Sequence, residues 1–240
     1  MRANLHEVVE QFQLDTVPDV LPDRLSQPRY NIAPTQPVTA ILCPKDVQHQ
    51  ELVGLRWGLI PSWAKDAAIG NQTINARAET VAEKPAFRSA FKSRRCLIVA
   101  DGYYEWQKLG KQKQPYFIHR RDERPFAFAG LYERWSGGAG VPLTATSSNS
   151  PLSSSSTLTP SPWETCTIIT TSANAFTQPI HYRMPVILHS ADFLHWLDPQ
   201  ENHRERLESL LRPFEGDDFV ATPVSTHVNN PRHEDPECLQ

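Results

Sequence analysis

The apolar positions of this chain form short continuous or alternating runs, a pattern typical of strands. Such runs are found at residues 38–43, 52–60, 96–101, 115–121, 126–135, 165–173 and 184–189. They do not alternate regularly with helical segments, as the strands of a doubly wound fold would. The pattern therefore predicts an α+β fold built on a mixed, mainly antiparallel sheet.

Helical spacing is confined to a few short segments. Residues 4–14 repeat apolar positions every three or four residues, and Asn4 can cap the first turn. The other predicted helices lie at residues 84–92, with Pro85 in the first turn, at residues 190–198, with Ser190 as the cap, and at residues 202–214.

Residues 136–162, "SGGAGVPLTATSSNSPLSSSSTLTPSP", are of low complexity. They offer few side chains to bury, which predicts a flexible insertion between two strands. A chain of 240 residues suits one sizeable domain, so a single domain over residues 1–240 is expected.

Composition narrows the class of protein. Apolar residues make up 39% of the chain and charged residues 21%, as in soluble globular proteins, and the net charge is −3. Contact with nucleic acid would therefore depend on local positive charge. The sequence shows neither a membrane-spanning run nor a signal peptide, so a cytoplasmic protein without a membrane partner is expected.

The cysteines are Cys43, Cys96, Cys166 and Cys238, and they show no C-x-x-C spacing and no zinc-type pairing with histidine. The first three lie in or beside apolar runs, which favours buried free thiols in a reducing compartment. We therefore expect neither a metal site nor a cofactor. The sequence does not indicate an oligomeric state.

One short stretch raises a chemical question. In "VADGYYEWQK", residues 99–108, Glu105 stands among three large aromatic residues at the end of a predicted strand. A carboxyl group beside apolar rings tends to have a raised pKa, which suits it to proton transfer near neutral pH.

Three further stretches are dense in functional side chains: "NIAPTQ", "RWGLIPSWAK" continuing to "INARAET", and "TTSANAFTQPIHYRMPVIL". Taken singly, their residues have ordinary structural explanations. Asn75 would brace a turn, and His181 would be a structural histidine. Arg77 and Glu79 would form a surface ion pair of little stability. Only the combination points to a function.

That combination resembles the SRAP (SOS-response-associated peptidase) family, whose members act on abasic sites in DNA. The resemblance runs in order through "YNIAP", "WGLIPSWA", "NARAET", "FRSAF", "CLIVADGYYEW", "QPYFI", "IHYRMPVIL" and "VSTHVNNPRHEDPECL". It implies one α+β domain with a curved, barrel-like, mainly antiparallel sheet and short flanking helices. It also implies a role in the SOS response to DNA damage, with hydrolase (protease) self-processing at the N-terminus.

The resemblance further implies a covalent reaction. In the family, the α-amine of an N-terminal cysteine condenses with the aldehyde of the open abasic sugar, and the thiol closes a thiazolidine ring. The pKa of an α-amine is about 7.7–8.0, so part of it is neutral and nucleophilic at pH 7. By motif, Glu105 corresponds to the proton shuttle, Asn75 would position the N-terminal residue, and His181 would assist ring opening and reversal of the crosslink.

The implied partner is single-stranded or junction DNA that contains an abasic site. Basic residues would bind phosphates, aromatic residues would stack on bases or wedge the duplex, and one hydroxyl would contact the DNA backbone. At the matching positions, the basic residues are Arg2, Arg77, Arg88 and Arg183, the aromatic residues are Trp63 and Trp106, and the hydroxyl is that of Thr170.

The start of the chain departs from the family pattern Met-Cys-Gly-Arg-aromatic-Ala. This chain begins "MRANLHEV", in which Arg2 and Ala3 match but the cysteine, the glycine and the aromatic residue are missing. Three explanations stay open: residues of the natural N-terminus are missing, the protein binds the lesion without a covalent bond, or the amine of Met1 or Arg2 forms a Schiff base. In the last case, β-elimination and strand cleavage would compete, which is lyase activity.

A non-catalytic DNA-binding module for single strands or junctions, on the same fold, is the alternative function. A general peptidase is less well supported, because the chain contains neither G-x-S-x-G nor H-E-x-x-H.

Overall fold

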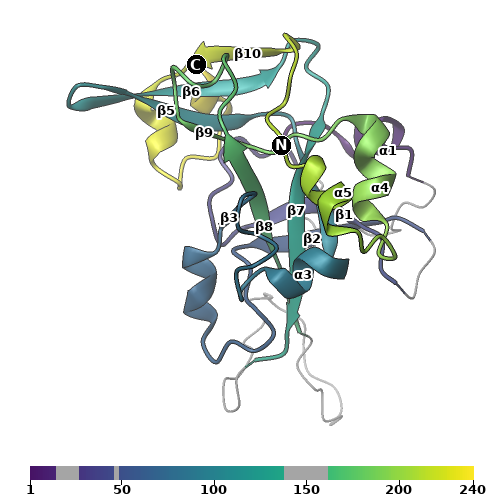
Figure 1. The fold of residues 1–240 in the computed structure, drawn as a ribbon. Coiled ribbons are helices and arrows are strands. Elements are labelled where there is room, and N and C mark those ends of the chain that lie inside the picture. The colour runs from purple at the N-terminus through teal and green to yellow at the C-terminus, as the bar shows by residue number, and fades with distance from the viewer. Residues whose placement is uncertain (15–26, 46–48, 138–161) are drawn as a thin grey trace, which may run out of the picture.

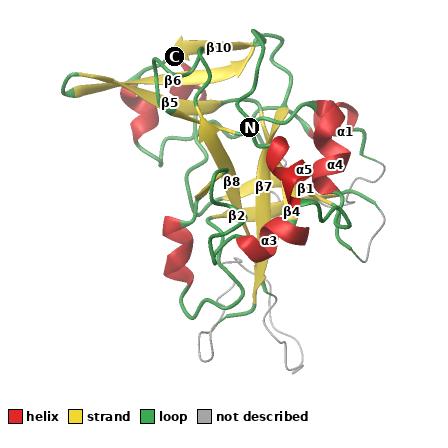
Figure 2. Cartoon of the chain, viewed as in Figure 1, coloured by secondary structure: helices red, strands yellow, loops and turns green. Residues whose placement is uncertain are grey.

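The computed structural model describes residues 1–14, 27–45, 49–137 and 162–240 (Figure 1). The predicted flexible insertion at 136–162 lies outside this part of the chain, except at its two ends. Within the described residues, strands dominate and the helices are short (Figure 2). None of these helices is long and apolar enough to cross a membrane.

The larger sheet closes into a barrel. Its strands are β1 (Pro37–Leu42), β2 (Glu51–Trp57), β3 (Asn75–Arg77), β4 (Arg95–Ala100), β7 (Phe126–Trp135), β8 (Trp163–Ser172) and β9 (Arg183–Pro185). The barrel strands follow the order β2-β1-β4-β7-β8, and β8 pairs again with β2. The pairings along this order are antiparallel, whereas the closing pair is parallel and joins Trp57 to Cys166. The predicted α+β class with a barrel-like, mainly antiparallel sheet is therefore confirmed.

A small antiparallel sheet lies at one end of the barrel (Figure 1). It consists of β5 (Tyr103–Leu109), β6 (Gln112–Arg120) and β10 (Phe219–Pro223) in the order β10-β6-β5. The chain passes from β4 into β5 through Asp101 and Gly102. A Cβ atom on Gly102 would lie 2.2 Å from the ring of Phe117, so only glycine allows β5 to approach β6 this closely. The position of β5 thus depends on the Asp-Gly step.

The predicted helix at residues 4–14 is confirmed as α1 (Leu5–Phe12). The Asn4 side chain accepts a hydrogen bond from the Glu7 backbone N–H at 3.0 Å, and the Glu7 carboxylate accepts one from the Asn4 N–H at 3.0 Å. This capping box stabilises the start of the helix by satisfying donors that otherwise lack a partner.

The other helices differ from their predicted bounds. α3 is found at Arg88–Ser93, because residues 80–87 form turns instead of a first helical turn at Pro85. The predicted Ser190 cap is wrong: Ser190–Asp192 is a 3-10 turn that starts after His189, and α4 follows at Phe193–Leu197. The last predicted helix is shorter than expected, as α5 (Arg204–Ser209).

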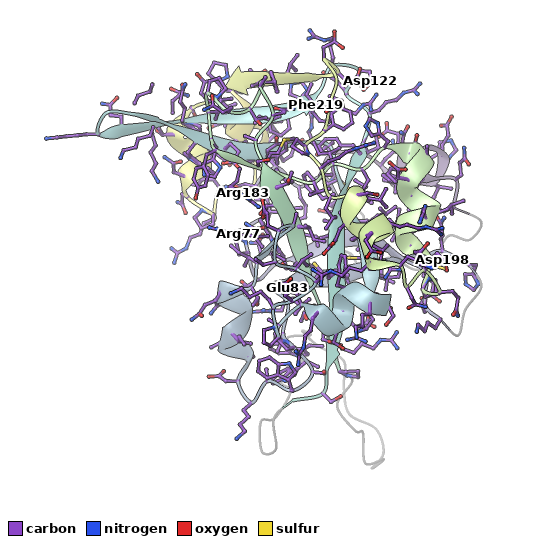
Figure 3. All side chains as sticks on the ribbon, in the orientation of Figure 1. Arg77, Glu83, Asp122, Arg183, Asp198 and Phe219 are labelled. Atoms are coloured by element: carbon purple, nitrogen blue, oxygen red, sulfur yellow. The ribbon has the colours of Figure 1, made fainter. Side chains whose placement is uncertain are left out.

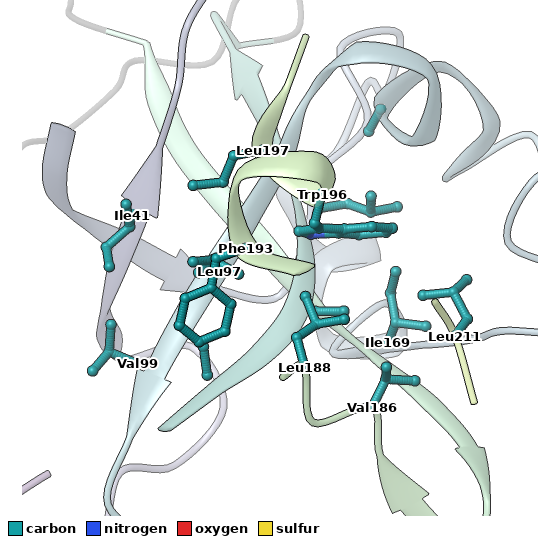
Figure 4. Packing of buried hydrophobic residues seen from close by; sticks show 14 of the residues in the cluster. Ile41, Leu97, Val99, Ile169, Val186, Leu188, Phe193, Trp196, Leu197 and Leu211 are labelled. Atoms are coloured by element: carbon teal, nitrogen blue, oxygen red, sulfur yellow. The ribbon is translucent and has the colours of Figure 1, made fainter. Parts of the chain in front are cut away.

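The main apolar core lies between the barrel and the helices α1, α3, α4 and α5. Figure 4 shows the part of this core where Phe193, Trp196 and Leu197 pack on the barrel. Trp196 is fully buried, and its indole N–H donates to the carbonyl oxygen of Cys96 at 3.0 Å, which joins α4 to β4. Beside it, the buried Arg95 donates to the carbonyl oxygens of Phe91 and Trp196 at 2.8 and 2.7 Å. Burial lowers the pKa of Arg95 to about 10. These hydrogen bonds fix the helices against the barrel.

The predicted burial is confirmed for Cys96 and Cys166 but not for Cys43. Cys96, Cys166 and Cys238 are buried free thiols, and Cys43 is a half-buried one.

Candidate functional site

A cavity of about 780 Å³ lies where the small sheet meets the barrel. Its walls come from the first two residues, strands β3 and β5, the ends of β8 and β9, and the C-terminal segment. The N-terminus lies in the same region (Figure 1). Segments that are far apart in the sequence therefore share one cavity.

Strand β5 explains why a carboxylate stands among aromatic residues. Successive side chains of a strand point to opposite faces. Tyr103 packs in the barrel cluster, with its ring 5.8 Å from that of Phe128. Tyr104 and Trp106 belong to the cluster on the other face. Glu105 therefore shares the face of Tyr103, and it lines the cavity.

His181 approaches Glu105 from the loop that precedes β9. Its Nδ1 atom lies 3.6 Å from Oε2 of Glu105 and 3.0 Å from the carbonyl oxygen of Arg183. Burial raises the pKa of Glu105 above its ordinary value, and the charge of His181 only partly opposes this shift. A carboxyl group that is readily protonated beside an imidazole can both donate and accept a proton.

The amino group of residue 1 lines the same cavity. The Met1 amine donates to the carbonyl oxygen of Arg29 and lies 3.9 Å from Oδ1 of Asp101. Asp101 is 6% exposed, and its Oδ2 accepts from the Arg2 backbone N–H at 2.5 Å and from Nε at 3.2 Å. Burial lowers the pKa of the Met1 amine, and Asp101 partly opposes this change. The amine thus has a larger neutral fraction than a fully hydrated one.

The short strand β3 supplies two predicted residues. Asn75 and Arg77 are exposed on either side of the buried Ala76, and both line the cavity. Parallel pairing of β3 with β8, which places Asn75 opposite Ile168, determines their position.

Arg183 is extensively hydrogen-bonded within the protein. Its Nη1 and Nη2 atoms form a two-pronged pair with the Glu79 carboxylate at 2.6 and 3.0 Å. Nη2 also donates to the carbonyl oxygen of Thr170 at 2.6 Å and lies 3.3 Å from its hydroxyl. Arg77 lies on the same side of the molecule (Figure 3) and has no ion pair among the described residues. Arg77 is therefore the more available of the two cations.

The structure separates the remaining predicted DNA-binding residues into two groups. Arg2 and Trp106 line the cavity, and the Trp106 indole N–H donates to Oδ1 of Asn229 at 2.7 Å. Trp63, which is 58% exposed, and Arg88, at the start of α3, do not line it. DNA contacts by all four of these residues stay predictions.

Among the residues that line the cavity, Asp101, Tyr103 and Tyr182 have chemically useful side chains that sequence reasoning missed. The Tyr103 hydroxyl is buried without a hydrogen-bond partner among the described residues. The Tyr182 ring lies 4.7 Å from the imidazole of His181. For Tyr103 and Tyr182, the available signal was their position within "DGYYEW" and "IHYRMP".

Three potential metal ligands lie together outside the cavity, although the sequence spacing indicated no metal site. The ligand atoms of His227, Asp235 and Cys238 are within 4.8 Å of one another. Each already has a structural partner: His227 pairs with Asp235 at 3.2 Å, and the Cys238 thiol donates to the carbonyl oxygen of His233 at 3.5 Å. These contacts account for the cluster as a brace of the C-terminal segment.

The chain was compared with known proteins. Residues 1–231 match the family described as SOS response associated peptidase (SRAP). The abasic site processing protein YoqW of Bacillus subtilis is 43% identical over 239 residues, which cover 99% of this chain and 96% of that protein. The abasic site processing protein HMCES of Gallus gallus is 33% identical over 251 residues, which cover 92% of this chain and 68% of that protein.

A solved structure agrees with these matches. The X-ray structure of a protein from Bacteroides thetaiotaomicron superimposes with a TM-score of 0.72 at 30% identity and covers 100% of this chain and 97% of its own. The family match and the relatives extend over the barrel, the small sheet and the cavity alike, and the chain therefore belongs to the SRAP family.

Proposed function

We propose that this chain processes abasic sites in DNA. It binds single-stranded or junction DNA at a baseless sugar and reacts with the aldehyde of the open sugar. The observation that carries the proposal is the Glu105–His181 pair, which shares one cavity with residue 1. The relatives named abasic site processing proteins support it, because YoqW aligns over nearly the whole chain.

The nucleophile is an α-amine at the position of Met1, either its own or that of a residue made N-terminal by processing. The neutral amine adds to C1′ of the aldehyde, and the carbinolamine loses water to give a Schiff base. Protonated Glu105 donates the proton that lets hydroxide leave as water, and the resulting carboxylate can take a proton back. The raised pKa of Glu105 favours its role as the proton donor, and the lowered pKa of the Met1 amine favours its attack on the aldehyde.

The fate of the Schiff base depends on a thiol. A thiol on the first residue would add to the imine carbon and close a thiazolidine, giving a lasting crosslink. Without it, loss of a C2′ proton and departure of the 3′ phosphate cleave the strand. His181 would help to open the sugar and reverse the adduct, and Asn75 would position the first residue. N-terminal self-processing, in this proposal, uses the same proton-transfer pair.

A non-catalytic binding module is the second candidate. The observation that favours it is that none of the four cysteines lines the cavity with Glu105 and His181. Such a module would bind single-stranded or junction DNA through Arg2, Arg77 and neighbouring residues and would form no covalent bond.

One experiment separates these possibilities. The protein, with its N-terminal residue determined by intact mass, is incubated with abasic and undamaged single strands and with a strand–duplex junction, with and without borohydride. The proposal expects an adduct on abasic DNA only, and expects Glu105→Gln to slow its formation while the exposed-helix control Glu205→Gln does not. Binding without any adduct, equal for abasic and undamaged DNA, would overturn the proposed reaction and support the module, and the lack of both adduct and binding would overturn both.

A further inference from the structure

Tyr182 is exposed at the edge of the cavity. The large apolar and aromatic side chains that are exposed among the described residues are Trp63, Leu109, Phe176, Tyr182 and Leu194. Of these, only Tyr182 lines the cavity, and it is 66% exposed. An aromatic ring left in water beside a reactive pair is available to stack on a ligand.

The backbone holds this ring in a defined place. The Tyr182 carbonyl oxygen accepts from the Ala173 N–H at 3.1 Å, and the preceding His181 N–H donates to the Thr177 carbonyl oxygen at 3.0 Å. The next residue, Arg183, is held by Glu79. The Tyr182 ring centroid lies 4.7 Å from that of His181, with 42° between the planes. A ring fixed this way loses little conformational freedom when it binds a base.

Trp106 is less available for this role. Its indole N–H donates to Asn229, and its ring lies 6.5 Å from that of Tyr104. The protein already uses both the polar end of Trp106 and part of its apolar surface.

An abasic site leaves the neighbouring base without a stacking partner on one side. We infer that Tyr182 occupies that side: its ring stacks on the nucleobase that flanks the baseless sugar, and it favours a purine there because a purine offers the larger aromatic face. The inference rests on the proposed function, which places the sugar next to His181. It assigns Tyr182 a role in substrate preference and none in proton transfer.

The test measures whether the effect of replacing Tyr182 depends on the base beside the lesion. Affinities are measured for Tyr182→Ala, Tyr182→Leu and Tyr182→Phe on single strands with one abasic site. The base on each side of the lesion is in turn a purine, a pyrimidine or a second baseless residue. Tyr182→Ala and Tyr182→Leu should weaken binding of the purine-flanked strand about fivefold or more, and Tyr182→Phe should restore it. With a baseless neighbour on the contacted side, the wild type and Tyr182→Ala should bind equally.

The matched control is Leu194→Ala, an equally exposed side chain that does not line the cavity, and it should bind every strand like the wild type. Equal losses for Tyr182→Ala whether or not a neighbouring base is present would overturn the inference, as would no loss at all. Wild-type discrimination between abasic and undamaged strands is recorded in the same assay. If the wild type prefers abasic strands but the effect of Tyr182→Ala does not depend on the neighbouring base, only the stacking role of Tyr182 is wrong. If the discrimination itself is absent, the proposed function fails.

Discussion

The Nδ1 atom of His181 lies 3.6 Å from Oε2 of Glu105, although His181 precedes β9 of the larger sheet and Glu105 belongs to β5 of the small sheet. The pair therefore joins the two sheets within the lining of the cavity. Its geometry depends on how firmly β5 is held, which is the task of Gly102 and of the aromatic rings around Glu105.

Replacing Glu105 by glutamine should slow reaction with abasic DNA by about 10²–10⁴-fold, the usual contribution of a general acid–base group. Binding of undamaged single strands should hardly change, because the variant removes a proton donor and leaves the cations in place. Single-turnover adduct formation measures the first effect and fluorescence anisotropy the second. Unchanged adduct kinetics would rule out the proton-transfer role.

The same variant should raise the stability of the protein at neutral pH. The pKa of Glu105 is raised on folding, so the folded state binds a proton more readily than the unfolded state. The stability that Glu105 contributes is fully present below the pKa of Glu105 in the unfolded chain. It is lost as the pH rises through the pKa of Glu105 in the folded protein. Thermal unfolding at pH 7 should show a higher midpoint for Glu105→Gln than for the wild type, and the difference should shrink towards pH 4. A lower midpoint at pH 7 would contradict this account.

Asp101→Asn tests the control of the amine at residue 1. The negative charge of Asp101 raises the pKa of the Met1 amine and opposes the effect of burial. The asparagine variant lacks this charge but can still accept the Arg2 backbone hydrogen bond. The pH at which borohydride-trapped adduct reaches half its maximum should therefore move downwards. A shift to higher pH would show that Asp101 acts only by holding the chain in place.

Arg77→Ala should weaken binding of single-stranded DNA and reduce its dependence on salt. One lost phosphate contact on a single strand lowers the slope of log K against log salt by about 0.7. Arg206→Ala removes an exposed arginine of α5 that does not line the cavity, and it serves as the control. Equal slopes for the two variants would mean that Arg77 contacts no phosphate.

Glu79→Gln should increase affinity for single-stranded DNA. Glu79 occupies the guanidinium of Arg183, so a phosphate must displace it before Arg183 can bind DNA. Because the Glu79 side chain is half exposed, breaking the ion pair should raise the affinity for DNA only about 1.5- to 5-fold. Glu83→Gln breaks the Glu83–Arg204 pair outside the cavity and should leave affinity unchanged. Weaker binding by Glu79→Gln would instead make Glu79 a necessary brace of Arg183.

The sequence predicted elements with strong local signals. The strand at residues 126–135 and the Asn4-capped helix are found where the pattern placed them. Strand β5 was not predicted as a strand, because aromatic residues cover both of its faces and hide the alternation of apolar and polar side chains. β3 was missed since only Ala76 of its residues is buried. Ser190 was misjudged as a cap because a 3-10 turn, which local composition does not distinguish, comes before α4.

Residues of the candidate site were likewise predicted only where a local motif indicated them. The motifs pointed to Asn75, Glu105 and His181, which the structure brings to one cavity. Asp101 carried no comparable signal, because an aspartate after a strand is common in turns. Only its 3.9 Å distance from the Met1 amine gives it a chemical role. Distances across the fold cannot be read from spacing along the chain.

The parallel β2–β8 pair also affects how the chain refolds. β8 lies between β2 and β7 and closes the barrel, so until β8 is in place β2 and β7 each lack a partner along one edge. Unpaired edges of this kind invite association with other chains. Contacts between distant segments form slowly, so insertion of β8 should limit the rate of refolding. A nascent chain is thus most prone to aggregation in the interval before Trp163–Ser172 has been synthesised.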